Sequence, residues 1–96
     1  MRVLFTGLAR QELEDATAFY EQERPGLGGR FREEVRATIR RIQEHPASWP
    51  VVRDDVRAGL LYRFPYRLLY STEVDYLLII AIAHQHRRPD YWVGRK

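Results

Sequence analysis

The chain has 96 residues, 45% of them hydrophobic, so its size suits one domain over residues 1–96 with one core, and wholesale disorder is not expected. It lacks cysteine, which excludes disulfides, cysteine-ligated metal and thiol catalysis and is typical of the reducing cytoplasm. The formal net charge is +3, and the longest apolar run, residues 77–83, is too short to span a bilayer, so we expect a soluble cytoplasmic protein without a signal peptide.

The N-terminal half predicts a strand followed by a helical hairpin. Residues 3–5 are apolar and partly β-branched, which favours a strand, and Thr6 can cap a helix that begins after it. Two apolar stripes then recur at steps of three and four residues, the pattern of two amphipathic helices. Pro25 ends the first helix near Glu23, and Pro46 ends the second by His45. The stripes are Ala9, Leu13, Ala16 and Tyr20 in the first helix and Leu27, Phe31, Val35, Ile39 and Ile42 in the second.

The C-terminal half changes to the periodicity of strands. Residues 47–55 are expected to form a loop, and residues 60–64 a strand that stops at Pro65. In the next strand, residues 66–70, Arg67 and Leu69 face away from Tyr66, Leu68 and Tyr70. After a polar turn, residues 76–83 are continuously apolar, which is typical of a central strand covered on both faces. The predicted order is β-α-α-β-β-β, an α+β fold with a mostly antiparallel sheet and the helical hairpin packed on one face.

The surplus charge lies in the C-terminal tail. From His84 onward the chain has four basic residues and one acid, Asp90, whereas the remainder has 12 basic and 12 acidic residues. Surplus charge at the end of an apolar strand indicates a binding surface rather than a requirement of the fold. The basic residues stand beside Tyr91 and Trp92, and arginine with aromatic residues is a composition enriched at binding hot spots.

Several short segments, taken in order, resemble those of RelE/ParE-family toxins of type II toxin–antitoxin systems. The resemblance covers essentially the whole chain, about residues 3–95, and it depends on the ordered set rather than on any single motif. The matching residues are Ala9 and Leu13, Phe19-Tyr20, Ile42 to Pro46, Phe64-Pro65-Tyr66-Arg67-Leu68-Leu69-Tyr70, Ala83-His84, Arg87-Arg88-Pro89, Tyr91-Trp92 and Arg95.

This resemblance implies a toxin that a cognate antitoxin neutralises, with one of two activities. The ParE-like branch inhibits DNA gyrase, and the RelE-like branch cleaves messenger RNA on the ribosome. RelE-like enzymes place lysines on the strand before the Tyr-Arg-Leu strand, and residues 58–61 here contain neither lysine nor histidine. We therefore expect a ParE-like protein-binding inhibitor rather than an enzyme. The alternatives are a ribosome-dependent endoribonuclease and an inactive module that only binds an antitoxin.

The two activities predict different site residues. For gyrase inhibition, we expect the effector-facing segment to consist of Arg87, Arg88, Tyr91, Trp92 and Arg95. A nuclease would instead use Arg67, His84, His86, Arg87 and Tyr91. In either case we expect an acidic antitoxin segment to lie across apolar helix and sheet surfaces, with its carboxylates on arginines.

Each candidate also has a structural alternative. Arg67 can pair with Glu73 or Asp75, His84 can be a half-buried histidine bonded to the backbone, and Trp92 can cap the core. Only Asp90 is close enough in sequence to neutralise Arg87 and Arg88. His84 and His86 have no third histidine or cysteine in reach, so neither a metal nor another cofactor is expected.

Overall fold

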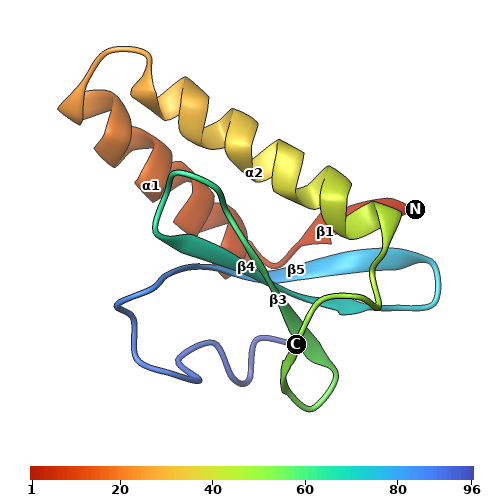
Figure 1. Ribbon diagram of the computed structural model, residues 1–96. Helices are drawn as coiled ribbons and strands as arrows, with labels where there is room; N and C mark the ends of the chain where they lie inside the picture. Colours follow the sequence, from red (N-terminus) through yellow and green to blue (C-terminus); the bar gives the residue numbers. More distant parts are fainter.

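The computed structural model describes all residues, Met1–Lys96, as a five-stranded sheet with two helices on one face and the C-terminal tail on the other (Figure 1). Neither helix combines the length and the apolar composition that a membrane span requires. In chain order the elements are β1 (Arg2–Phe5), α1 (Gly7–Glu23), α2 (Leu27–Glu44), β2 (Val51–Arg53), β3 (Val56–Leu60), β4 (Tyr66–Thr72) and β5 (Tyr76–His84).

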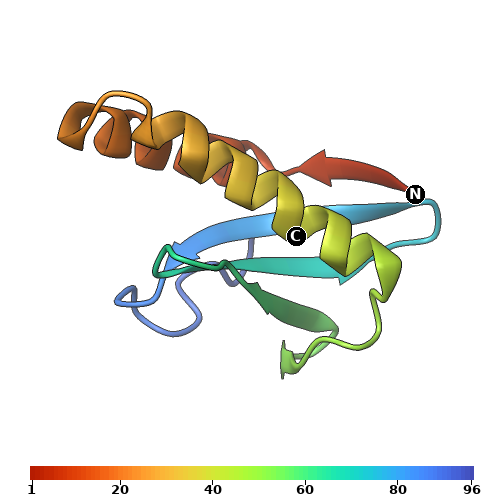
Figure 2. The ribbon, with the colours of Figure 1, turned by 45° about the horizontal axis from the view of Figure 1, so that its top comes forward.

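The sheet has the strand order β1-β5-β4-β3-β2. Only the β1–β5 pair is parallel, and the other pairs are antiparallel. The helical hairpin connects β1 to β2, the two edge strands of the sheet. Figure 2 shows both helices above the same sheet face. The predicted α+β class, the mostly antiparallel sheet and the one-sided hairpin are therefore confirmed.

Strand β5 is central and is covered on both faces, as its apolar run predicts. Leu77, Ile79 and Ile82 pack against the helices in the larger core cluster, with Phe31 and Leu68. The opposite face belongs to a second, smaller cluster under the tail, whose members are Val56, Ala58, Leu69, Ile80, Ala81, Ala83 and Trp92.

The helix boundaries follow the predicted signals. The Thr6 hydroxyl accepts a hydrogen bond from the Ala9 N–H at 3.0 Å, so it caps α1. The two helices approach closely where Gly28 faces α1, since a Cβ at this position would lie 2.7 Å from the Thr17 carbonyl oxygen. A side chain there would push the hairpin apart, which explains a glycine within the first turn of α2.

Two strand predictions were wrong. The expected loop at residues 47–55 contains the short edge strand β2, so the sheet has five strands rather than four. The strand expected at residues 60–64 ends at Leu60, and β3 begins earlier, at Val56. Residues 61–65 turn instead, because the Tyr62 N–H is bound by the Glu34 carboxylate, Arg63 has a left-handed φ of 68° and Pro65 has no N–H to donate.

Candidate functional site

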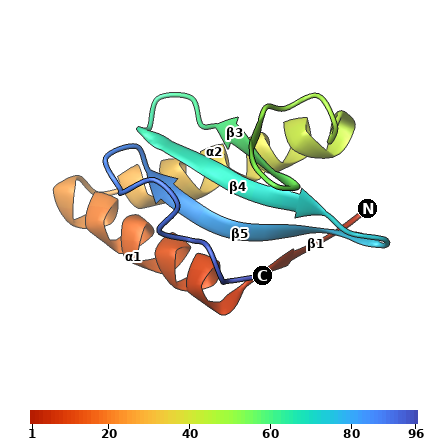
Figure 3. The same ribbon diagram turned by 90° about the horizontal axis from the view of Figure 1, so that it is seen from below.

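The C-terminal tail folds back under the sheet on the face away from the helices (Figure 3). Trp92 is only 6% exposed and packs in the second cluster against residues of β3, β4 and β5. The structural alternative for Trp92, an apolar cap, is therefore confirmed. Its side chain is available to an effector only if the tail leaves the sheet.

A bulge in β5 leaves a backbone carbonyl oxygen to which the tail binds. Leu69 is paired with Ala81 and Tyr70 with Ile79, so Ile80 is the extra residue. Strand β1 ends at Phe5, opposite Ile79, and leaves the second half of the β5 edge without a neighbouring strand. The Ile80 carbonyl oxygen instead accepts from the Thr6 hydroxyl at 3.2 Å and from Arg95 Nη1 at 3.1 Å.

Glu12 of α1 joins this edge to the tail. Its carboxylate accepts hydrogen bonds from the Ile82 N–H at 3.0 Å, the Tyr91 hydroxyl at 2.7 Å, and Nη1 and Nη2 of Arg95 at 2.9 and 3.1 Å. The hydrogen bond with Glu12 raises the pKa of Arg95. Burial is the main cause that raises the pKa of Tyr91, and the hydrogen bond with the Glu12 carboxylate raises it further. We call Glu12, Tyr91 and Arg95 the tail clamp.

Two of the predicted effector residues, Tyr91 and Arg95, have a structural role in the tail clamp. The Arg95 side chain is 11% exposed and that of Glu12 18% exposed, so this ion pair is largely shielded from water. Sequence reasoning did not find Glu12, because 79 residues separate it from Tyr91 and no local pattern connects the two. The available signal was the position of Glu12, an acidic residue directly before Leu13 of the apolar stripe.

The other charges of the tail are also paired, except for two arginines. The Lys96 ammonium contacts the carboxylates of Asp55 and Glu73, which lowers the pKa of Asp55. Asp90 pairs with Arg53 at 3.1 Å rather than neutralising its neighbours.

Arg87 and Arg88 thus keep their charge without a carboxylate partner, since neither takes part in an ion pair. Both are exposed. The Arg87 guanidinium lies over the Tyr91 ring, 4.0 Å from its centroid, which holds this side chain in place.

The two histidines lie together where β5 ends. Their rings stack with centroids 5.1 Å apart, and the His86 N–H donates to His84 Nδ1 at 3.1 Å. The His84 ring also meets the edge of the Tyr66 ring at 5.0 Å. His84 is half-buried, so the alternative of a histidine bonded to the backbone at the strand end is confirmed.

Arg67 is separated from these histidines. Its partner in the sheet register is Ala83, whereas His84 is opposite Tyr66, so the Arg67 and His84 side chains emerge on opposite faces. The structural alternative for Arg67, an ion pair with Glu73 or Asp75, was wrong, because Glu73 binds Ser71 and Lys96, and Arg67 forms no ion pair. Of the residues proposed for a nuclease, His84, His86, Arg87 and Tyr91 thus lie near one another, and Arg67 lies apart on the opposite face.

A small hollow of about 220 Å³ lies beside the exposed Arg87, between α1 and β5, and the carboxylates of Glu12 and Asp15 also line it. Its lining includes Phe19, His84 and Arg87, and Phe19 is 55% exposed although it is a large apolar residue. We call Phe19, His84, Arg87 and Arg88 the effector surface. It combines an apolar side chain with two guanidinium groups that have no carboxylate partner, a composition enriched at binding hot spots.

Comparison with known proteins places the chain among toxins. The family model described as "ParE toxin of type II toxin-antitoxin system, parDE" matches residues 3–89. A solved structure titled "Chromosomal ParDE TA system from P. aeruginosa" aligns over 88% of this chain and 95% of the other, with a TM-score of 0.76 and 18% sequence identity. No curated protein matches the chain in sequence.

Proposed function

The chain belongs to the ParE toxin family of type II toxin–antitoxin systems, and we propose that it arrests growth by binding and inhibiting DNA gyrase in the cytoplasm. It is the toxin component of its pair, so it has a cognate antitoxin as a partner. Protein binding is favoured over catalysis because the tail presents exposed guanidinium groups without a carboxylate partner, whereas Arg67 is separated from the two histidines and β3 contributes no lysine.

One observation carries this proposal: Arg87 and Arg88 have no carboxylate partner in a tail whose other charged residues are paired. Arginine prefers a carboxylate or phosphate held by two bonds. Both arginines lie beyond β5 and outside the core, and both are exposed; Arg87 stacks on Tyr91, which leaves its guanidinium without a carboxylate partner. Phe19 adds an exposed apolar side chain in the hollow that Arg87 lines, as expected at a hot spot.

The ribonuclease alternative lacks comparable support. RNA cleavage needs a base for the 2′-hydroxyl and a cation at the developing phosphorane charge, within reach of the same phosphate. His84 lies on one sheet face and Arg67 on the other, so Arg87 is the arginine beside the histidines, and β3 contributes no lysine.

Growth and reporter assays test the proposal. Induced expression should stop growth and activate the DNA damage response without an early loss of translation, and co-expression of the antitoxin should restore growth. Arg87→Ala with Arg88→Ala should remove toxicity while circular dichroism and antitoxin affinity stay unchanged. Arg36→Ala with Arg40→Ala, on the far face of α2, is the matched control and should remain toxic. A toxic Arg87/Arg88 variant and a harmless control would move the effector site to α2.

A further inference from the structure

The two arginines of the effector surface differ in how firmly each side chain is held. The Arg87 guanidinium lies 4.0 Å from the centroid of the Tyr91 ring, whereas Arg88 lies over no aromatic ring. A guanidinium that stacks on a ring keeps N–H donors available for a carboxylate. Arg87 is therefore held in place without being neutralised.

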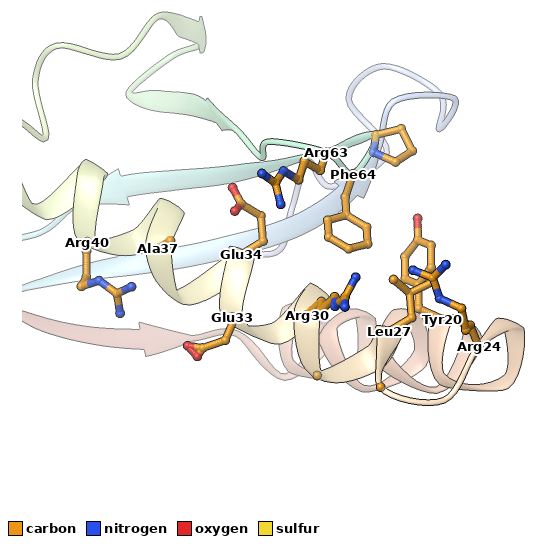
Figure 4. A pocket seen from close by; sticks show the side chains of 13 residues that line it. Tyr20, Arg24, Leu27, Arg30, Glu33, Glu34, Ala37, Arg40, Arg63 and Phe64 are labelled. Carbon is orange, nitrogen blue, oxygen red and sulfur yellow. The ribbon is translucent and has the colours of Figure 1, made fainter.

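Most of the other arginines that lack an ion pair also lack such support. A hollow of about 950 Å³ between α2 and the turn at residues 61–65 is lined by four of them, all exposed (Figure 4): Arg24, Arg30, Arg40 and Arg63. Figure 4 shows Arg24 and Arg30 at the α1–α2 end and Arg63 on the opposite wall. None of the four lies over an aromatic ring. Among the arginines without an ion pair, only Arg10 and Arg87 do so.

The Tyr91 ring is itself anchored by groups outside the tail. Its hydroxyl donates to Glu12 Oε2 at 2.7 Å, and Glu12 Oε1 accepts from the Ile82 N–H at 3.0 Å. The Arg95 guanidinium lies 4.9 Å from the centroid of the same ring and binds the same carboxylate. Through this one ring, Arg87 is connected to both α1 and β5.

The backbone on both sides of the two arginines is attached to the sheet as well. Before them, the Gln85 N–H donates to the Pro65 carbonyl oxygen at 2.9 Å. After them, Asp90 pairs with Arg53 of β2 at 3.1 Å. The path of the chain is thus fixed at both ends, and the arginine side chains are the part that remains to be oriented.

An arginine that is oriented in advance binds at a lower cost. A long side chain that loses its rotamer freedom only on association weakens the affinity by roughly twofold to tenfold. A side chain that is already held in the free protein does not lose this freedom again. The Tyr91 ring can therefore strengthen binding through Arg87 without contacting the partner itself.

We propose that Tyr91 is a positioning residue of the effector surface: anchored by Glu12, its ring holds the Arg87 guanidinium in the orientation that binds a carboxylate of gyrase. This inference rests on the proposed function, which supplies gyrase as the partner. It gives Tyr91 a different role from direct contact with the effector, because the half-buried ring acts through Arg87.

A double-mutant cycle with the purified toxin tests this role. We would measure the Kd for immobilised gyrase by surface plasmon resonance for Tyr91→Leu, for Arg87→Ala and for the combination. Arg87→Ala should weaken binding about 30-fold and Tyr91→Leu about fivefold. In the Arg87→Ala background, Tyr91→Leu should have no further effect, because the side chain that the ring positions is absent.

Three control measurements separate positioning from general damage to the tail. In the Arg88→Ala background, Tyr91→Leu should still weaken binding about fivefold, since Arg88 lies over no ring. Tyr91→Phe keeps the ring but loses the hydrogen bond to Glu12, so it should weaken binding only about twofold. Arg10→Ala removes the other stacked arginine without an ion pair, which lies 4.4 Å from the centroid of the Phe5 ring, and should bind as wild type does.

If circular dichroism shows that Tyr91→Leu is unfolded, Arg87→Lys tests the same point from the exposed side. Lysine keeps the charge but has no planar group to stack on the ring, so Arg87→Lys should bind gyrase about tenfold more weakly than wild type. Binding as tight as that of the wild type would overturn the inference.

The cycle also distinguishes this inference from the proposed function. A fivefold loss for Tyr91→Leu in the Arg87→Ala background would show a merely structural role and overturn the inference alone. Unchanged binding of Tyr91→Leu in the wild-type background would also overturn it alone. A wild-type toxin that does not bind gyrase would overturn the proposed function, and this inference with it.

Discussion

Removal of the Glu12 carboxylate should destabilise the protein by about 3 kcal/mol. Glu12→Ala deletes the acceptor of four hydrogen bonds, one from the Ile82 N–H, one from Tyr91 and two from Arg95. Breaking a buried ion pair from one side costs about 3–5 kcal/mol, because the remaining charge stays shielded from water. Arg95 retains its bond to the Ile80 carbonyl oxygen, so the lower end of that range applies.

Thermal and urea unfolding followed by circular dichroism measure this effect. For a chain of this size about 1 kcal/mol shifts the melting temperature by roughly 4–8 °C, so Glu12→Ala should melt roughly 15 °C below wild type. Glu14→Ala is the matched control on the same helix, since Glu14 is 54% exposed and pairs only with Arg32. Its loss should cost less than about 1 kcal/mol.

A double-mutant cycle makes the reasoning refutable. Glu12→Ala combined with Arg95→Met should cost less than the sum of the single changes, because the second substitution removes the charge that the first leaves unpaired. Hydrogen exchange of the tail amides should also accelerate in Glu12→Ala. Equal melting temperatures for Glu12→Ala and Glu14→Ala would show that the tail clamp does not hold the tail.

Three further predictions concern packing, Arg67 and pH. Gly28→Ala should cost about 1–3 kcal/mol because its Cβ meets the Thr17 carbonyl oxygen, whereas Gly29→Ala, which meets nothing within 4 Å, should be neutral or stabilising in urea unfolding. Arg67→Ala should change stability by less than about 0.5 kcal/mol and leave growth arrest intact, because Arg67 has no ion-pair partner; a folded but harmless variant would contradict this. Burial raises the pKa of Tyr66 and of Tyr70 to about 12, so the folded state keeps protons that the unfolded chain releases above about pH 10. The contribution of these two tyrosines to stability should therefore begin to fall above about pH 10 and continue to fall toward about pH 12, as urea midpoints between about pH 9 and pH 12 would report.

The helices and β5 were predictable because their signals are local. The spacing of Leu13, Phe31 and Val35, the cap at Thr6 and the prolines after each helix define the hairpin without knowledge of the rest. Strands β2 and β3 depend instead on pairing. Residues 56–60 include Ala58 and Gly59, which have weak strand preference, yet they pair with β4, whereas the more strand-like residues 61–64 turn away.

The site was predictable in composition but not in arrangement. The surplus charge of the tail pointed to Arg87 and Arg88, and these remain without a carboxylate partner. The structural role of Arg95 could not be predicted, because its partner Glu12 is 83 residues away in sequence. The bulge at Ile80, which leaves a carbonyl oxygen free to bind Arg95, also has no sequence signal. Long-range polar contacts of this kind are set by tertiary structure alone.

Gyrase inhibition by purified protein tests the central claim most directly. The wild-type toxin should inhibit supercoiling of relaxed plasmid or trap cleaved DNA, Arg87→Ala/Arg88→Ala should be inactive, and Arg36→Ala/Arg40→Ala should be as active as wild type. Ribosome-bound messenger RNA should stay intact at the same toxin concentration. Unchanged supercoiling together with cleavage of messenger RNA in the ribosomal A site would contradict the account and assign the toxin to the nuclease branch.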